Sequence, residues 1–319
     1  MTLQRPNGEF IRLSAAEPFS YAHNLDYLRR SPDECLYRIA DGGVIHRAVR
    51  LGDRPVLLEI REAEDVEPGL DVRIETLGEA EAAFNPAEAD AARIDYKDEA
   101  ARYVREWFDL DHELQPFYAM ADADPLLQGA AGRFRGLRLM GIPDLFEALC
   151  WGIIGQQINL AFAYTLKKRF VQTFGQSAET EGHTLWMFPE PQRIAELEVG
   201  DLTPLQLTAR KSEYLIGVAR LMAEGRLDKQ SLLAKGSVAE IEKSLVGLRG
   251  IGPWTANYVM MRCLRLKAAF PIDDVGLHNA IKTVIGSEAK PSKSEIMRLA
   301  AGWSGWEAYA TFYLWRVCG

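Results

Sequence analysis

Hydrophobic positions follow different periods in the two parts of this chain. Up to about residue 80, short apolar runs alternate with polar residues and are separated by Gly/Asp turns such as Asp41-Gly42-Gly43. Alternation with a period of two, bounded by such turns, predicts strands joined by hairpins. The predicted strands cover residues 10–13, 35–40, 44–49, 55–60 and 71–77. With a short helix at Asn24–Arg30, the pattern predicts a small antiparallel sheet with one or two helices.

From about residue 95 the apolar residues recur at helical spacing, and they do so to the end of the chain. The first of these helices is predicted at Asp95–Phe108, with Asp95 as its cap. An Ala/Glu/Asp-rich stretch at 79–101 precedes and overlaps it, and its first half is predicted to be a connector. The fold class is therefore α+β: a small N-terminal antiparallel sheet domain with helices, followed by an all-α module.

Length and composition are those of a globular protein with two or three structural units. The chain has 319 residues, of which 48% are apolar, and no run is long enough to span a bilayer. The N-terminus has no signal-peptide core, so a cytoplasmic location is the default expectation. The four cysteines are scattered without a C-x-x-C pair, which argues against a zinc or iron–sulfur site with closely spaced ligands.

Charge is distributed unevenly. The net charge is −8, yet residues 201–319 carry +5 while residues 1–200 carry −13. A basic region on an acidic protein can still bind a polyanion locally. Charge alone, however, favours a solvated surface of mixed sign.

The string Leu248-Arg-Gly250-Ile251-Gly252-Pro253 predicts a tight turn between two helices. Glycine tolerates positive φ and close approach of another backbone, and proline suits the first helical position. Such a turn presents backbone N–H groups to a phosphate without reading sequence. Its carbonyls, at Leu248 and Gly250, could also hold a monovalent cation. The competing interpretation is a helical hairpin in which glycine has only a structural role.

Two adjacent carboxylates, Asp273 and Asp274, follow the apolar run Phe270-Pro-Ile272 and precede a helix. Aspartate is a favoured helix cap, and spacing alone favours that role. An aspartate beside an apolar pocket can also act as a base or stabilise a cation.

Aromatic residues gather near this segment and at the C-terminus. Trp254 and Tyr258 are four residues apart and share one helix face, and the tail contains Trp303, Trp306 and Trp315 among others. Core packing accounts for most aromatic stripes. The alternative is a pocket that stacks on a planar, electron-poor ring.

Two glutamines, Gln156 and Gln157, lie between two apolar helical segments. They form either a polar helix–turn–helix loop or polar groups that enter a gap in a nucleic acid duplex.

With these residues in hand, the chain resembles the helix–hairpin–helix DNA glycosylase superfamily, and most closely its alkylated-base (3-methyladenine type II) branch. The resemblance rests on Leu248–Tyr258, on the tail Trp303…Trp306…Tyr309…Trp315, and on further strings beyond about residue 100. Those strings include Asp124-Pro-Leu-Leu127, Gly136-Leu-Arg-Leu139, Pro143-Asp-Leu-Phe-Glu147 and Ile154-Gly-Gln156.

The resemblance implies roles for single positions. Asp274 falls at the catalytic carboxylate, with Asp273 as its capping neighbour. Trp254, Tyr258 and Trp315 fall at the walls of the base pocket. The phosphate-binding hairpin corresponds to Leu248, Gly250, Ile251, Gly252 and Thr255. Gln156 and Gln157 fall at the wedge that fills the space left by a flipped base, although a leucine stands at the position of Gln157 in the best-known member.

The resemblance also implies the reaction. Relatives that cut the strand carry a lysine where this chain has Trp254, and an indole cannot form the Schiff base that such cleavage needs. The expected activity is thus a monofunctional glycosylase that flips alkylated purines such as 3-methyladenine from damaged duplex DNA and leaves an abasic site. Two alternatives remain open: a glycosylase for oxidised purines, and a non-catalytic helix–hairpin–helix DNA-binding protein.

The implied organisation has three parts: an N-terminal domain at 1–95, a helical subdomain at 134–263 carrying the hairpin, and a second at 96–133 and 264–319 carrying the Asp274 helix. A monomer that binds duplex DNA and no membrane is the default expectation. No cofactor is expected, apart from a possible Na or K ion at the hairpin.

Overall fold

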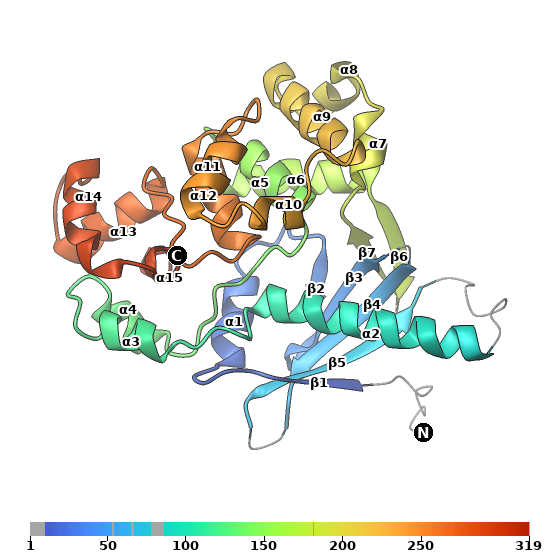
Figure 1. Cartoon of the computed structure of the whole chain (residues 1–319), viewed down its shortest axis with the longest axis horizontal. Coiled ribbons are helices and arrows are strands. Elements are labelled where there is room, and N and C mark those ends of the chain that lie inside the picture. Colours follow the sequence, from blue (N-terminus) through green and yellow to red (C-terminus); the bar gives the residue numbers. More distant parts are fainter. Residues whose placement is uncertain (1–9, 53, 65–66, 78–85, 181, 319) are drawn as a thin grey trace.

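The computed structural model describes residues 10–318, apart from 53, 65–66, 78–85 and 181. An antiparallel sheet at one end adjoins a larger body of helices (Figure 1). No helix within these described residues is long and apolar enough to cross a bilayer. The N-terminal nine residues and part of the predicted connector, at 78–85, lie outside the described residues.

The large sheet confirms the strands expected from the alternating pattern. Its order is β1-β5-β4-β3-β2, with every neighbouring pair antiparallel. The strands are β1 (Phe10–Ser14), β2 (Tyr37–Ile39), β3 (Ile45–Leu51), β4 (Arg54–Glu62) and β5 (Gly69–Thr76). A short helix, α1 (Tyr21–Leu28), begins after Ser20, whose side chain accepts a hydrogen bond from the His23 N–H.

Both faces of the sheet are covered. On one face, α1 and α2 (Pro86–Phe108) join the main core, where the Tyr21 and Phe108 rings stack at 6.5 Å. On the other face, Ala48 and Leu57 pack with Leu185 of a second, two-stranded sheet made of β6 (Gln176–Thr180) and β7 (His183–Met187). The side chains of β3 are therefore buried on both sides, although the strand alternates in polarity.

The helical body contains the remaining elements. In chain order they are α3 (Gln115–Ala121), α4 (Gln128–Arg133), α5 (Leu145–Ile154), α6 (Leu160–Phe174), α7 (Pro191–Ala195), α8 (Val199–Leu202), α9 (Ala209–Ala223), α10 (Lys229–Leu233), α11 (Val238–Val246), α12 (Pro253–Arg262), α13 (Val275–Ile285), α14 (Lys293–Leu299) and α15 (Glu307–Trp315). The helical body also has 3₁₀ turns at Thr203–Leu205 and Ala300–Trp303, and a third, at Asp41–Gly43, connects β2 and β3. Figure 1 shows α12, α13 and α15 converging on the side away from the large sheet.

One prediction from the pattern was wrong, and one element was missed. Helix α2 begins at Pro86, so Asp95 is an interior residue rather than a cap. The pair β6–β7 was not predicted. Only Leu185 and Met187 of β7 are buried, and two apolar side chains are too weak a signal for alternation.

Candidate active site

Asp274 lies at the N-terminus of α13, and three N–H groups fix its carboxylate. Oδ1 accepts from the Leu277 backbone N–H at 2.8 Å and from Trp315 Nε1 at 2.7 Å. Oδ2 accepts from Trp254 Nε1 at 2.9 Å. A carboxylate offers about four lone-pair sites, so Oδ2 keeps one for a water molecule or a substrate. The group is half-buried and held between two indoles.

The helix cap is Asp274 itself, which corrects the expectation that Asp273 would provide it. The φ and ψ of Asp274 (−69°, 124°) are those of a cap residue, and its side chain bonds the third residue of the helix. Asp273 points instead to solvent and forms an ion pair with Lys293 at 2.6 Å. The side chain of Asp274 therefore both caps α13 and accepts hydrogen bonds from two indoles.

Gly276 permits the close approach of Trp315 to Asp274. A Cβ at position 276 would lie 2.9 Å from Asp274 Oδ1 and 3.1 Å from Trp315 Cδ1. Distances this short force at least one of the two groups to move. The sequence reasoning did not single out this glycine, because its role depends on a side chain 39 positions later.

The three aromatic residues expected at one pocket do lie together. The Trp254 and Tyr258 rings stack at 5.5 Å with planes 28° apart, and the Tyr258 and Trp315 rings lie at 6.4 Å and 30°. The hydroxyl of Tyr258 accepts a hydrogen bond from Arg262 at 3.0 Å. Burial raises the pKa of Tyr258 to about 12, so the ring stays a neutral, electron-rich surface at ordinary pH.

This aromatic wall is larger than the sequence indicated. Trp151 on α5 and Tyr164 on α6 form an apolar cluster with Tyr258, separate from the main core, and Trp254 and Trp315 pack against it. The Trp151 and Tyr164 rings lie 4.8 Å apart. Sequence reasoning missed both residues because each stands in an apolar helical stretch typical of core. By contrast, Trp303 is fully buried and bonds Asp124, as expected for core packing.

The two glycines of the hairpin between α11 and α12 have different environments. Gly250 has a φ of 93°, and a Cβ there would lie 2.2 Å from the Tyr214 ring. Gly252 has an ordinary φ of −88°, and a Cβ there would meet nothing within 4 Å. Only Gly250 is thus required by the fold, whereas Gly252 leaves open space in front of the helix N-terminus.

The side chains of two other hairpin residues, Ile251 and Thr255, point into the protein. Ile251 is buried and its N–H donates to Leu248 O, while Thr255 is buried against Gly152. The N–H groups of Gly250 and Gly252 have no acceptor among the residues that the structure describes. Apart from the exposed side chain of Arg249, the hairpin therefore presents backbone N–H groups to solvent.

The loop between α5 and α6 separates the two glutamines. Gln156 turns toward the hairpin, where its Nε2 donates to Gly250 O at 2.9 Å and to Thr255 Oγ1 at 3.2 Å. Gln157 is exposed and has a φ of 58°, in the left-handed region. Gln156 is thus part of the hairpin's support, and Gln157 is the one that projects.

The possible cation ligands in the hairpin already have protein partners. Leu248 O accepts from Ile251 N–H at 3.0 Å, and Gly250 O accepts from Gln156. Each carbonyl retains a second lone pair. Within the described part of the chain, no three His, Cys, Asp or Glu side chains are grouped as a metal site would require.

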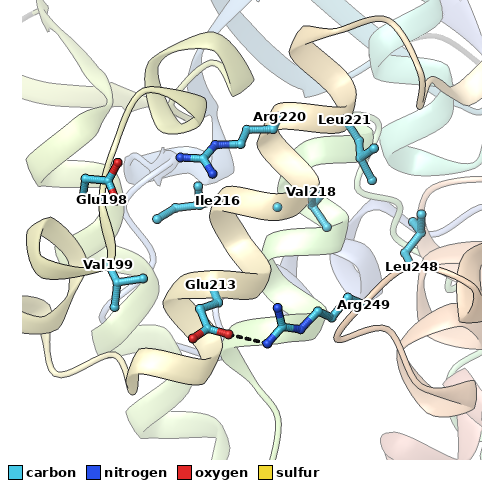
Figure 2. A pocket seen from close by; sticks show the side chains of 10 residues that line it. Glu198, Val199, Glu213, Ile216, Val218, Arg220, Leu221, Leu248 and Arg249 are labelled. Carbon is cyan, nitrogen blue, oxygen red and sulfur yellow. Dashed lines mark hydrogen bonds and ion pairs between the residues drawn. The ribbon is translucent and has the colours of Figure 1, made fainter.

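A groove of about 400 Å³ lies beside the hairpin, between α9 and Leu248 (Figure 2). Its polar lining is dominated by the Glu213–Arg249 ion pair at 2.6 Å. It contains neither the aromatic cluster nor Asp274. The aromatic site at Asp274, rather than this groove, therefore has the groups needed for chemistry on a planar ligand.

Comparisons with known proteins agree with this geometry. Residues 150–305 match the model of the HhH-GPD superfamily base excision DNA repair proteins, and residues 32–149 match the 8-oxoguanine DNA glycosylase N-terminal domain. The chain is 47% identical to a DNA-3-methyladenine glycosylase of Bacillus subtilis (strain 168) over 97% of both chains.

Two solved structures share the fold. The 3-methyladenine DNA-glycosylase from Archaeoglobus fulgidus superimposes with a TM-score of 0.73 at 24% identity, covering 97% of both chains. An 8-oxoguanine glycosylase/lyase of Clostridium acetobutylicum, in complex with double-stranded DNA, gives 0.68 at 18% identity over 96% of both chains. The fold is thus common to both kinds of glycosylase, and the 47% relative over nearly the whole chain decides between them: this chain belongs to the HhH-GPD superfamily of base excision DNA repair proteins, in the group of the DNA-3-methyladenine glycosylases.

Proposed function

We propose that this protein is a monofunctional glycosylase that removes alkylated purines such as 3-methyladenine from duplex DNA. The observation that carries the proposal is the carboxylate of Asp274, held between the Trp254 and Trp315 indoles at the edge of an aromatic stack. The name of the Bacillus subtilis relative supports the same substrate class.

Binding begins at the DNA backbone. The open N–H groups at Gly250 and Gly252 bind one phosphate, which positions the duplex without reading its sequence. The exposed side chain of Gln157 enters the duplex and occupies the space of the extruded nucleotide. Flipping costs a few kcal/mol and is cheapest at weakened base pairs, which contributes to selectivity.

The pocket then favours an electron-poor ring. An alkylated purine carries positive charge, and the faces of Trp254, Tyr258 and Trp315 attract it. Because such a base is already a good leaving group, little acid catalysis is needed. The bond from C1′ to the base nitrogen breaks with its electron pair on the base, and the sugar becomes cation-like.

Asp274 completes the reaction. Its negative charge stabilises the sugar cation, and the free lone pair of Oδ2 orients a water molecule whose oxygen bonds C1′. The proton released by that water passes to solvent or to the departing base. Water is the only co-reactant, so no dissociable cofactor is needed. The carbonyls of Leu248 and Gly250 would hold a Na or K ion if one binds at the hairpin, and the ion would supply positive charge for a phosphate.

We expect no strand cleavage because of the residue at position 254. A lyase step needs an amine that forms a Schiff base with the sugar, and the indole of Trp254 offers only an N–H that is donated to Asp274. We therefore expect an intact strand with an abasic site, produced by a monomer acting on double-stranded DNA.

Base release from randomly methylated duplex DNA tests the function. The wild-type protein should release 3-methyladenine without nicking the strand. The Asp274→Asn variant should lose at least 100-fold in rate, because asparagine keeps the helix cap but not the charge. Its affinity for duplex DNA should stay within about twofold. Full activity of this variant would refute the role of Asp274.

A glycosylase for oxidised purines is the second candidate, favoured by the match of residues 32–149 to the 8-oxoguanine glycosylase N-terminal domain. A duplex with one 8-oxoguanine separates the two. Release of that base together with strand nicking would support the second candidate, and release of no base at all would leave only DNA binding.

A further inference from the structure

A narrow cavity of about 40 Å³ lies behind the aromatic wall, and we call it the rear cavity. Tyr258, Trp151 and Tyr164 line it and also belong to the aromatic cluster against which Trp254 packs. Side chains between Tyr27 and Tyr37, in the N-terminal part of the chain, line it as well. The rear cavity is too small for a purine, so only the edge of a ring that occupies the aromatic pocket could reach it.

Six charged side chains line the rear cavity, and the positive charges outnumber the negative ones. They are Arg30, Glu34, Arg47, Glu147, Lys167 and Arg262. Lys167 bonds Glu34 at 3.2 Å and Glu147 at 3.3 Å, and Arg47 bonds Glu147 at 3.0 Å. Burial opposes the charge on Lys167, but the two carboxylates outweigh it and raise its pKa. These four groups neutralise one another, which leaves the charges of Arg30 and Arg262.

Arg262 is buried and its guanidinium is held by the fold, whereas the guanidinium of Arg30 is bonded, within the described part of the chain, only by tyrosine hydroxyls. Arg262 is buried and bonds Met140 O and the Tyr258 hydroxyl. Arg30 is exposed to solvent, and its guanidinium lies 4.2 Å above the Tyr27 ring. Its polar partners among the described residues are two neutral hydroxyls, Tyr164 at 2.7 Å and Tyr27. A guanidinium has five N–H donors, so three stay available on a group that lines the rear cavity beside Tyr164 of the aromatic cluster.

We propose that Arg30 reads the edge of the flipped base and favours guanines alkylated at N3 over adenines alkylated at N3. This rests on the glycosylase activity proposed above. Guanine presents two acceptors, O6 and N7, on the edge where adenine presents one acceptor and an amino donor. The N–H donors of a guanidinium match the two acceptors of guanine. On adenine, one of these donors would face the amino group, which is itself a donor. The N-terminal part of the chain would thus act in specificity, through a residue just after α1.

Release of 3-methylguanine and of 3-methyladenine from the same methylated duplex tests this proposal. The two bases carry the methyl group at the same ring position and differ at the edge that Arg30 would contact. Under single-turnover conditions, the Arg30→Met variant should lower the 3-methylguanine rate relative to the 3-methyladenine rate by about tenfold, as expected for one lost donor–acceptor match. The Arg30→Gln variant, whose amide still donates, should recover part of the ratio.

The neighbouring Arg29 offers a matched control. Its side chain is exposed and has no hydrogen bond or ion pair within the described residues, so Arg29→Met removes the same charge and should leave the ratio unchanged. An equal fall of both rates in Arg30→Met, with a lower melting temperature, would show a structural role only. A salt-dependent loss of affinity for undamaged duplex would assign Arg30 to a phosphate. Either result overturns the proposal, while a wild-type protein that releases neither base refutes the glycosylase activity itself.

Discussion

The hairpin at 247–253 and the pocket around Asp274 lie close together in the chain but are built in different ways. The hairpin obtains its shape from glycines inside the turn, together with the single ring of Tyr214. The pocket obtains its shape from side chains far apart in sequence, because Asp274 bonds residues 20 positions before it and 41 after it. The first is a local structure that exposes backbone, and the second is a tertiary structure that orients side chains.

The largest effect should distinguish the two hairpin glycines. Gly250→Ala places a Cβ against the Tyr214 ring at positive φ and should lower the free energy of unfolding by about 3 kcal/mol. Gly252→Ala should change it by less than about 0.5 kcal/mol but weaken DNA binding, because its Cβ fills the space before the helix N-terminus. Urea denaturation and a DNA-binding titration measure both quantities. Equal destabilisation by the two substitutions would mean that the hairpin has no surface reserved for a ligand.

A smaller effect should test the pocket without disturbing the fold. Gly276→Ala should slow base release by about tenfold, because its Cβ separates the Trp315 indole from Asp274. Its free energy of unfolding should fall by no more than about 1 kcal/mol, because the helix preference of alanine offsets part of the lost hydrogen bond between Trp315 and Asp274. Gly129→Ala is the matched control: it occupies the same helical position in α4, and its Cβ would meet nothing within 4 Å. Unchanged base release in Gly276→Ala would show that the contact of Trp315 with Asp274 is dispensable.

The smallest effect concerns the loop between α5 and α6, which supports the hairpin through Gln156. Gln157→Ala should reduce base release about fivefold and leave stability unaltered, because its side chain is exposed. Gln156→Ala removes the hydrogen bonds to Gly250 and Thr255 and should lower the free energy of unfolding by about 1 kcal/mol. Thermal melts beside single-turnover assays separate the two residues. The reverse assignment, with Gln156 affecting only release, would make Gln156 the wedge.

A second contrast lies between the sheet and the helices. Alternation and turn residues predicted all five strands of the large sheet, since each run is bounded by glycine or aspartate. The same reasoning missed β6–β7 and misplaced the start of α2, where Asp95 offered a plausible cap within a continuous helix. Periodicity identifies an element more reliably than its end, because a cap residue is also acceptable inside a helix.

The sequence by itself determined the residue types at the site. The Leu-x-Gly-x-Gly-Pro turn, the aspartate pair and the aromatic residues at 254, 258 and 315 are visible without coordinates, because each belongs to a local motif with a local physical reason. Only the tertiary structure decided that Asp274 rather than Asp273 caps α13 and that Gln157 rather than Gln156 projects. It also decided that Gly276 lies against Trp315 and that Trp151 and Tyr164 join the aromatic cluster. Such facts depend on contacts between residues tens of positions apart, and neither spacing nor periodicity carries that information.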